Sequence, residues 1–172
     1  MRLGIAALAV FLAGPALGQQ HQHQHGQSPY AGLQQRDVKA LSDQQISDLR
    51  SGKGMGLALA AELNGYPGPI HVLELADRLG LTAGQRAELQ ELYEAMKAEA
   101  IPVGEKLIAH ERALERQFAE RTVSPVALAS LTADIGKTQG ELRAVHLKYH
   151  LTTAALLTTA QHQKYTQLRG YR

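Results

Sequence analysis

The feature that most constrains this chain of 172 residues is a pair of long apolar stripes with helical spacing. They occupy residues 83–120 and 124–157, and in each the members recur at alternating steps of three and four. Such spacing keeps side chains on one side of a helix, where they must be buried against a partner. The first stripe comprises Leu89, Tyr93, Met96, Ala100, Val103, Leu107, His110, Leu114 and Phe118. The second comprises Leu128, Leu131, Ile135, Thr138, Leu142, Val145, Tyr149, Thr152 and Leu156.

A short polar link joins the two stripes. Arg121-Thr122-Val123 separates them, and Ser124-Pro125 then supplies a favourable N-cap and a favoured first helical residue. A link this short makes neighbouring helices run antiparallel. No window alternates apolar and polar residues for long enough to indicate a strand. The sequence therefore predicts an all-α fold, built on one long antiparallel helical hairpin with short flanking helices.

Residues 1–18 have the features of a secretory signal peptide. Arg2 supplies the positive charge, residues 3–17 the apolar run, and Ala16-Leu17-Gly18 a small-residue cleavage site. As a helix this run would span roughly 22 Å, short of the ~30 Å hydrocarbon core of a membrane. We therefore expect a cleaved export signal, with a retained membrane anchor as the alternative. The chain has no cysteine, so its fold does not rely on disulfides.

A polar, low-complexity tail follows at residues 19–29, with the sequence QQHQHQHGQSP. It has too few apolar residues to fold by itself. His21, His23 and His25 stand at alternate positions, where a metal ion could gather them. The tail is either a solvated linker or an accessory metal-scavenging arm for zinc, copper or nickel, which neutral imidazole suits.

Residues 30–66 contain short helices and a glycine-rich connector. Ser42 and Gln45 form the pattern of a capping box, which opens a helix that extends to about Arg50. The glycines in residues 52–56 break this helix, and their GKGMG string lacks the spacing of a nucleotide-binding loop. Residues 67–172 form the main helical domain.

The charge balance excludes a nucleic-acid-binding surface. The chain has 18 basic and 16 acidic residues, and removal of the signal removes only Arg2, which leaves 17 against 16. Such near balance gives no electrostatic footprint for nucleic acid. Because no pairing of a nucleophile with a base and no cofactor loop is recognisable, we also expect the protein not to be an enzyme.

Three histidines outside the tail are candidates for a metal site. His146 and His150 are four residues apart, so their rings lie on one helix face. A turn in the middle of the link places His150 opposite Glu94, and the turn before the hairpin places His71 opposite residues near Glu91. His71, one of the two carboxylates, His146 and His150 could therefore converge. Three imidazoles and a carboxylate would suit Zn(II), Cu(II), Ni(II) or Co(II).

A structural interpretation of the same residues stays open. Paired histidines beside a helix seam are often half-buried, hydrogen-bonded residues, and Glu91 and Glu94 each fit a solvated helix face. His110 lies in the first stripe opposite Asp134, which predicts a structural contact between these two side chains.

Two copies of one short motif frame the hairpin. Residues 81–85 read LTAGQ and residues 157–161 read LTTAQ, both of the form LTxxQ. Two such copies behind a signal peptide resemble the Spy/CpxP superfamily of periplasmic helical proteins, which includes heavy-metal-resistance proteins of the CnrX and ZraP kind. The resemblance covers residues 69–171. It implies a four-helix antiparallel bundle in the periplasm that commonly forms a homodimer through its hairpins.

The resemblance also implies a ligand set. CnrX-like sensors use a histidine before the first motif, a glutamate early on the next helix, and a His-x-x-x-Met before the second motif. His71 falls close to the first position, Glu94 within one residue of the second, and His150 within one residue of the family histidine. The family methionine is missing, and His146 lies one turn earlier.

These observations lead to two functional hypotheses. The first is a periplasmic heavy-metal-binding protein for sensing or resistance, which binds a divalent transition metal (Zn, Cu, Ni or Co) and could pass the signal to a membrane sensor partner. The alternative is an ATP-independent chaperone of the envelope stress response, which holds unfolded envelope proteins on an exposed apolar surface.

Overall fold

The computed structural model describes residues 28–171 and divides the chain into two units, residues 1–31 and residues 32–172. Of the first unit only residues 28–31 are described. The expected signal peptide (1–18) and the tail histidines His21, His23 and His25 lie outside the described residues.

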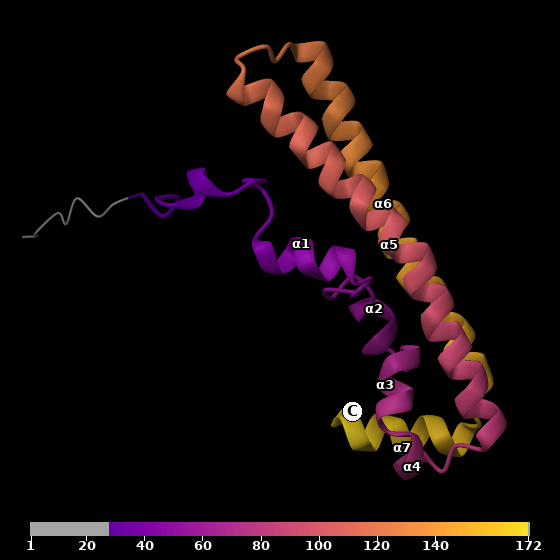
Figure 1. Cartoon of the computed structure of the whole chain (residues 1–172). Coiled ribbons are helices and arrows are strands. Elements are labelled where there is room, and N and C mark those ends of the chain that lie inside the picture. Colours follow the sequence, from indigo (N-terminus) through magenta and orange to yellow (C-terminus); the bar gives the residue numbers. More distant parts are fainter. Residues whose placement is uncertain (1–27, 172) are drawn as a thin grey trace, which may run out of the picture. The chain divides into compact units, whose positions relative to one another are not determined.

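The described part of the second unit is helical, with no strand. Figure 1 shows its elements, which are η1 (Leu33–Gln35), α1 (Asp43–Arg50), α2 (Leu59–Glu62), α3 (Pro69–Glu74), α4 (Ala76–Leu79), α5 (Ala83–Ala119), α6 (Pro125–Leu156) and α7 (Thr159–Arg169). The predicted all-α class is confirmed. Across residues 28–171, no helix combines the length and apolar character that a membrane span needs.

The helix starts are specified by local hydrogen bonds. Capping boxes open α1, α5 and α7, with Ser42, Thr82 and Thr158 as the N-cap residues. In each box the hydroxyl accepts from the backbone N–H of a glutamine three residues later, and the glutamine side chain accepts from the N-cap N–H. Ser124 caps α6 through a 3.2 Å bond from the Ala127 N–H. Each such cap contributes about 1 kcal/mol.

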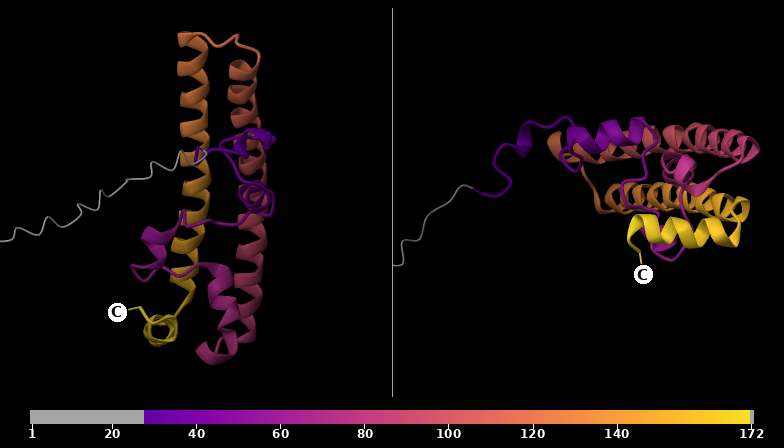
Figure 2. Two further views of the ribbon diagram at one scale, coloured as in Figure 1. Left: turned by 90° about the vertical axis from the view of Figure 1, so that its left-hand side faces the viewer. Right: turned by 90° about the horizontal axis from the view of Figure 1, so that it is seen from below.

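Helices α5 and α6 lie side by side over most of their length (Figures 1 and 2). Apart from Phe118 and Leu128, the stripe members from Leu89 to Tyr149 are buried or half-buried. Phe118, Leu128 and Thr152 are exposed, and the neighbouring Thr153 is buried in place of Thr152. Phe118 and Leu128 are exposed because they flank the connection, where the rest of the unit adds no third element to the pair.

The segment that leads into α1, and α1 itself, pack on the middle of α5. Their buried apolar residues join those of the helix pair in one cluster, which includes Val38, Leu41, Ile46, Leu49, Leu107, Ile108 and Leu142. Gly104 of α5 allows this approach, because a Cβ there would lie 2.7 Å from the Leu49 carbonyl oxygen. Ion pairs of Asp37, Lys39 and Arg50 with α5 fix the same segment.

A second apolar cluster closes the other end of the pair. Helix α7 lies across this end, next to α4 (Figures 1 and 2). The cluster contains Val72, Ala76, Leu79, Leu81, Leu89, Leu157 and Tyr165. The two LTxxQ motifs meet here, because the amides of Gln85 and Gln161 donate to each other at 2.9 and 3.1 Å. Each motif thus caps its own helix, α5 or α7, and its glutamine also links the N-termini of these two helices.

Candidate metal-binding pocket

A pocket of about 420 Å³ lies where the glycine-rich connector, α2 and the start of α3 meet the faces of α5 and α6. The residues that line it include His71, His146 and His150. The structure therefore brings the three histidines of the sequence analysis to one cavity. It does so although His71 lies on α3 and the other two lie on α6.

His146 is the most deeply buried of these histidines, with 2% of its surface exposed. Its Nε2 is buried and has no hydrogen-bond partner among the described residues. Burial, and then the neighbouring His150, lower the pKa of His146 below its ordinary value. The ring is therefore neutral at pH 7, the form in which imidazole binds a metal ion.

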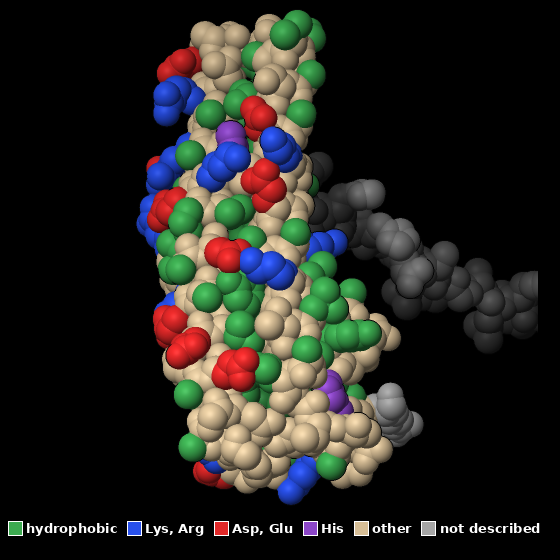
Figure 3. All heavy atoms as spheres, turned by 90° about the vertical axis from the view of Figure 1, so that its right-hand side faces the viewer, with side chains coloured by type: hydrophobic (Ala, Val, Ile, Leu, Met, Phe, Trp, Pro, Cys, Tyr) green, Lys and Arg blue, Asp and Glu red, His purple; other side chains and the backbone are tan. Residues whose placement is uncertain are grey.

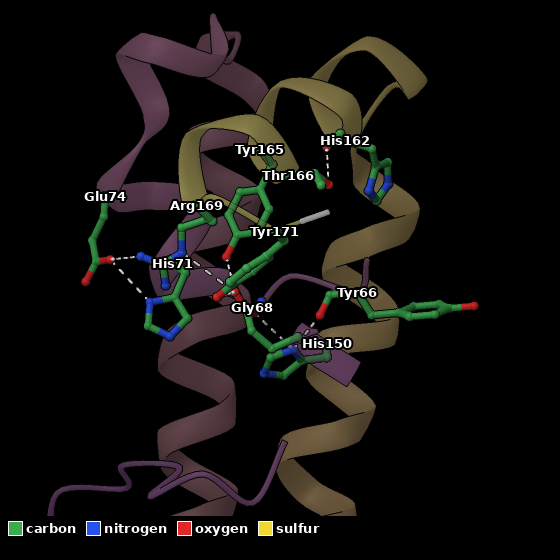
Figure 4. A network of polar contacts seen from close by, with 11 residues as sticks. Tyr66, Gly68, His71, Glu74, His150, His162, Tyr165, Thr166, Arg169 and Tyr171 are labelled. Atoms are coloured by element: carbon green, nitrogen blue, oxygen red, sulfur yellow. Dashed lines mark hydrogen bonds and ion pairs between the residues drawn. The ribbon is translucent and has the colours of Figure 1, made fainter. Parts of the chain in front are cut away.

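His150 lies one turn further along α6 and is held by a backbone carbonyl. Its Nδ1 is 2.6 Å from the Tyr66 carbonyl oxygen (Figure 4). Because a carbonyl only accepts, Nδ1 carries the proton and the lone pair lies on Nε2. A Cβ added at Gly68 would lie 2.9 Å from this Nε2, so glycine leaves the space that the ring occupies. Such a backbone contact is the usual means of orienting a metal-binding histidine.

His71 is half-buried and lines the pocket from α3. Its Nδ1 is 3.2 Å from an Oε atom of Glu74, one turn along the same helix (Figure 4). A carboxylate at Nδ1 favours the tautomer whose lone pair lies on Nε2. Glu74 also lines the pocket, so this wall offers both an imidazole and a carboxylate.

Glu62 is a buried carboxylate of the site that the sequence analysis missed. It is 6% exposed and lines the pocket from α2. It accepts hydrogen bonds from the hydroxyls of Tyr165 and Tyr171 and, at 3.1 Å, from the Gly68 N–H. Arg169 lies 3.7 Å from it, so the buried charge is compensated. A glutamate within the apolar stretch 55–63 was the only local signal for it.

The hydrogen bonds of Glu62 hold its side chain in place in the lining of the pocket. Burial, and then the bond to Glu62, raise the pKa of Tyr165 well above its ordinary value, so the phenol stays a donor. Oε2 of Glu62 also lies 3.8 Å from Nδ1 of His150. The network thereby joins α7 to α2 and α6 behind the histidines.

The two glutamates proposed from the sequence lie elsewhere. Glu91 and Glu94 are exposed and do not line the pocket. Glu94 instead accepts from Gln90 at 3.1 Å and lies 3.6 Å from the Lys97 ammonium. The face of α5 toward the pocket carries Tyr93 and Met96. One residue of displacement rotates a side chain by roughly 100° about the helix, which places Glu94 on the solvent side.

The predicted contact between His110 and Asp134 is not formed. Asp134 is exposed, and the Nε2 of His110 is buried without a hydrogen-bond partner among the described residues. His110 lies outside the pocket. It is a half-buried residue of the helix seam.

Within residues 28–171, no group of three histidine, aspartate or glutamate side chains lies close enough together to hold a metal ion. The pocket thus gathers suitable residue types without a closed cage of nitrogen and oxygen ligands. No family model, curated protein or solved structure matches this chain.

Proposed function

We propose that this protein is a periplasmic metal-binding protein of the sensing or resistance type, and that the histidine pocket holds a transition-metal ion. The observation that carries the proposal is His146, a deeply buried imidazole with an unpartnered nitrogen, one helical turn from His150. A buried polar atom without a partner costs about 1–3 kcal/mol, so its retention in a cavity favours a ligand there.

The ligands would be His146 and His150, with His71 as the third imidazole. Neutral imidazoles of this kind suit zinc, copper, nickel and cobalt. Glu74 replaces Glu94 as the candidate carboxylate ligand, because it lines the pocket and already contacts His71. Tyr66 and the Glu62 network would hold His150 in its orientation.

We also propose that the chain is a member of the Spy/CpxP superfamily, that it has a helical bundle of that type, and that it forms a homodimer. Support comes from the pairing of the two LTxxQ motifs, which gives both copies one structural purpose. The tail histidines His21, His23 and His25 would be accessory metal ligands of the same chain.

The test is metal titration of the chain from Gln19 onward, by calorimetry with Zn(II), Cu(II), Ni(II) and Co(II) and by competition with a chelator for Cu(I). The comparison variants are His146→Ala/His150→Ala and a tail variant with His21, His23 and His25 changed to alanine. We expect tight binding that survives in the tail variant and disappears in the double variant. Failure of every ion to bind the tail variant with a Kd below about 100 μM would refute the proposal.

A second function, that of an ATP-independent chaperone, is favoured by a separate observation. Leu59, Leu63, Tyr66 and Leu151 are large apolar residues that are all exposed on α2, the loop after it, and α6. On the face shown in Figure 3, apolar side chains lie between charged residues of both signs. Suppression of aggregation of a denatured client at equimolar ratio, and its loss in Leu59→Ser/Leu63→Ser, would establish this function; no suppression by the unmodified chain would exclude it.

A further inference from the structure

The chain has three methionines, and the two that lie outside the predicted signal peptide both line the histidine pocket. Met96 comes from α5 and Met55 from the glycine-rich connector. Neither position follows from the ligand pattern of the sequence analysis. The residues that line the pocket therefore include two thioethers as well as three imidazoles.

Met96 alone has an ordinary structural interpretation. It belongs to the first apolar stripe and is buried, as a residue in a helix seam should be. Its side chain nevertheless reaches the same cavity as His146 and His150. Methionine is a flexible, polarisable side chain, which can move toward an ion without a change in the helix.

Met55 does not have such an interpretation. Its backbone φ is 44°, in the left-handed region that residues with a side chain rarely adopt, and 41% of its surface is exposed. A strained backbone of this kind is energetically unfavourable. An apolar residue held at this cost at the mouth of a pocket, with little burial in return, indicates a functional use for its side chain.

We infer that the pocket is a Cu(I) site, with the imidazole of His146 and the thioethers of Met55 and Met96 as its ligands. The inference rests on the proposed function, because it names the ion and further ligands for the same pocket. Soft thioether ligands select Cu(I) over the harder divalent ions, for which imidazole and carboxylate are better suited. This donor set also explains why no three histidine or acidic side chains of the described residues form a cage.

The surroundings of the three side chains fit a soft, singly charged ion. Ala58, Leu59, Pro69 and Ile70 add apolar surface to the wall. The buried carboxylate that lines the pocket, Glu62, already has two tyrosine hydroxyls, a backbone N–H and Arg169 as partners. The pocket therefore offers soft donors and apolar walls, without a free buried carboxylate for a divalent ion.

The experiment is a competition titration with a chromophoric Cu(I) chelator, under reducing and oxygen-free conditions. It uses the chain from Gln19 onward with His21, His23 and His25 changed to alanine, so that the tail does not compete. The variants are Met55→Leu, Met96→Leu and the double variant, with His162→Ala as the control histidine outside the pocket. Leucine keeps the volume and removes only the sulfur, so the folds should persist.

We expect a complex of one Cu(I) per chain that is weakened about tenfold or more by each methionine replacement and is unchanged by His162→Ala. X-ray absorption at the copper edge should show sulfur neighbours that are lost in the double variant. Zn(II) affinity should stay the same in all methionine variants.

Other outcomes separate the inference from the proposed function. Cu(I) binding that is indifferent to both methionines, or without sulfur neighbours, would overturn the thioether site. If divalent ions bind through His146 and His150 while Cu(I) binds no more tightly, the inference fails and the proposed function stands. If no ion binds, both fail.

Discussion

The two ends of the α5–α6 pair differ sharply in what covers them. Around the connection, residues 112–134 contain no buried residue, and Phe118 and Val126 are 55% and 81% exposed. At the other end, the connector, α2, α3, α4 and α7 add a further layer to the pair. Most of the buried polar residues, namely Glu62, His146, His150, Thr153 and Gln161, lie at this covered end.

The comparison shows that periodicity alone does not decide burial. Both ends have the same apolar spacing, but a side chain is buried only where another element covers it. A third layer also creates the low-dielectric space in which polar groups need specific partners. The buried polar groups of the described residues are therefore concentrated at the end where further helices cover the α5–α6 pair.

The largest effect on stability is expected from Glu62→Ala, at the covered end of the pair. The change removes the acceptor of Tyr165 and Tyr171 and leaves Arg169 without its buried partner. We expect a loss of about 3–5 kcal/mol in the free energy of unfolding, because buried polar groups would be left unpaired. Urea denaturation followed by circular dichroism measures it.

Glu94→Ala is the matched control for that experiment. It removes a glutamate that is exposed on α5, and we expect a change within about 0.5 kcal/mol. Equal stability of the two variants would show that the covered end does not depend on its polar network.

A smaller effect is expected from Gly68→Ala at the wall of the pocket. The added Cβ would meet the ring of His150, which must shift or lose its bond to the Tyr66 carbonyl. We expect a loss of about 1–3 kcal/mol, as is typical for an extra methyl group in a packed site, and weaker metal binding. Thermal unfolding with and without metal measures both. Gly140→Ala is the control, because a Cβ there meets no atom within 4 Å.

Sequence reasoning succeeded where the physics is local. The caps at Ser42, Thr82 and Thr158 each depend on a glutamine three residues away, so a short pattern specifies them. Apolar spacing also located α5 and α6 to within one residue at their ends, because periodicity accumulates over many turns.

The candidate site could be predicted only in part, because its contacts are long-range. Histidine spacing suggested that His146 and His150 share a face, but no local pattern pairs Glu62 with Tyr165, which is 103 residues away. The sequence predicts Glu94 at the site although Glu94 lies on the solvent side, because approximate pairing across a hairpin does not fix helix rotation. The strained backbone of Met55 has no signal in its own residue type.

A still smaller effect is expected in the pH dependence of stability, from the buried carboxyl of Glu111. Glu111 is a buried residue of α5 that has no ion pair or side-chain hydrogen bond within the described residues. Burial raises the pKa of its carboxyl above the ordinary 4.5. The folded state therefore keeps this proton to higher pH than the unfolded state does. The contribution to stability is present below pH 4.5 and is lost as the pH rises through the folded-state pKa.

Glu111→Gln keeps the shape of the side chain but cannot ionise, so the loss of stability on ionisation of Glu111 should disappear. We expect the variant to be more stable than the unmodified chain at pH 7, with the difference disappearing below about pH 4.5. Urea denaturation at a series of pH values measures the difference. A variant that is less stable at pH 7 would mean that the carboxylate has a stabilising partner in solution.

The smallest effect is expected from Phe118→Ser at the uncovered end. Because the ring is 55% exposed and has no third element over it, its loss should change the stability of a monomer by no more than about 0.5 kcal/mol. By comparison, Leu107→Ala should lower the free energy of unfolding by about 2–5 kcal/mol, because Leu107 is buried in the apolar cluster between α1 and the helix pair. A homodimer formed through this end would change the result, because Phe118 would then be covered by a second copy and its replacement would lower the melting temperature in a concentration-dependent way. Melting curves at several protein concentrations therefore decide whether the uncovered end is free or is the contact of the proposed dimer.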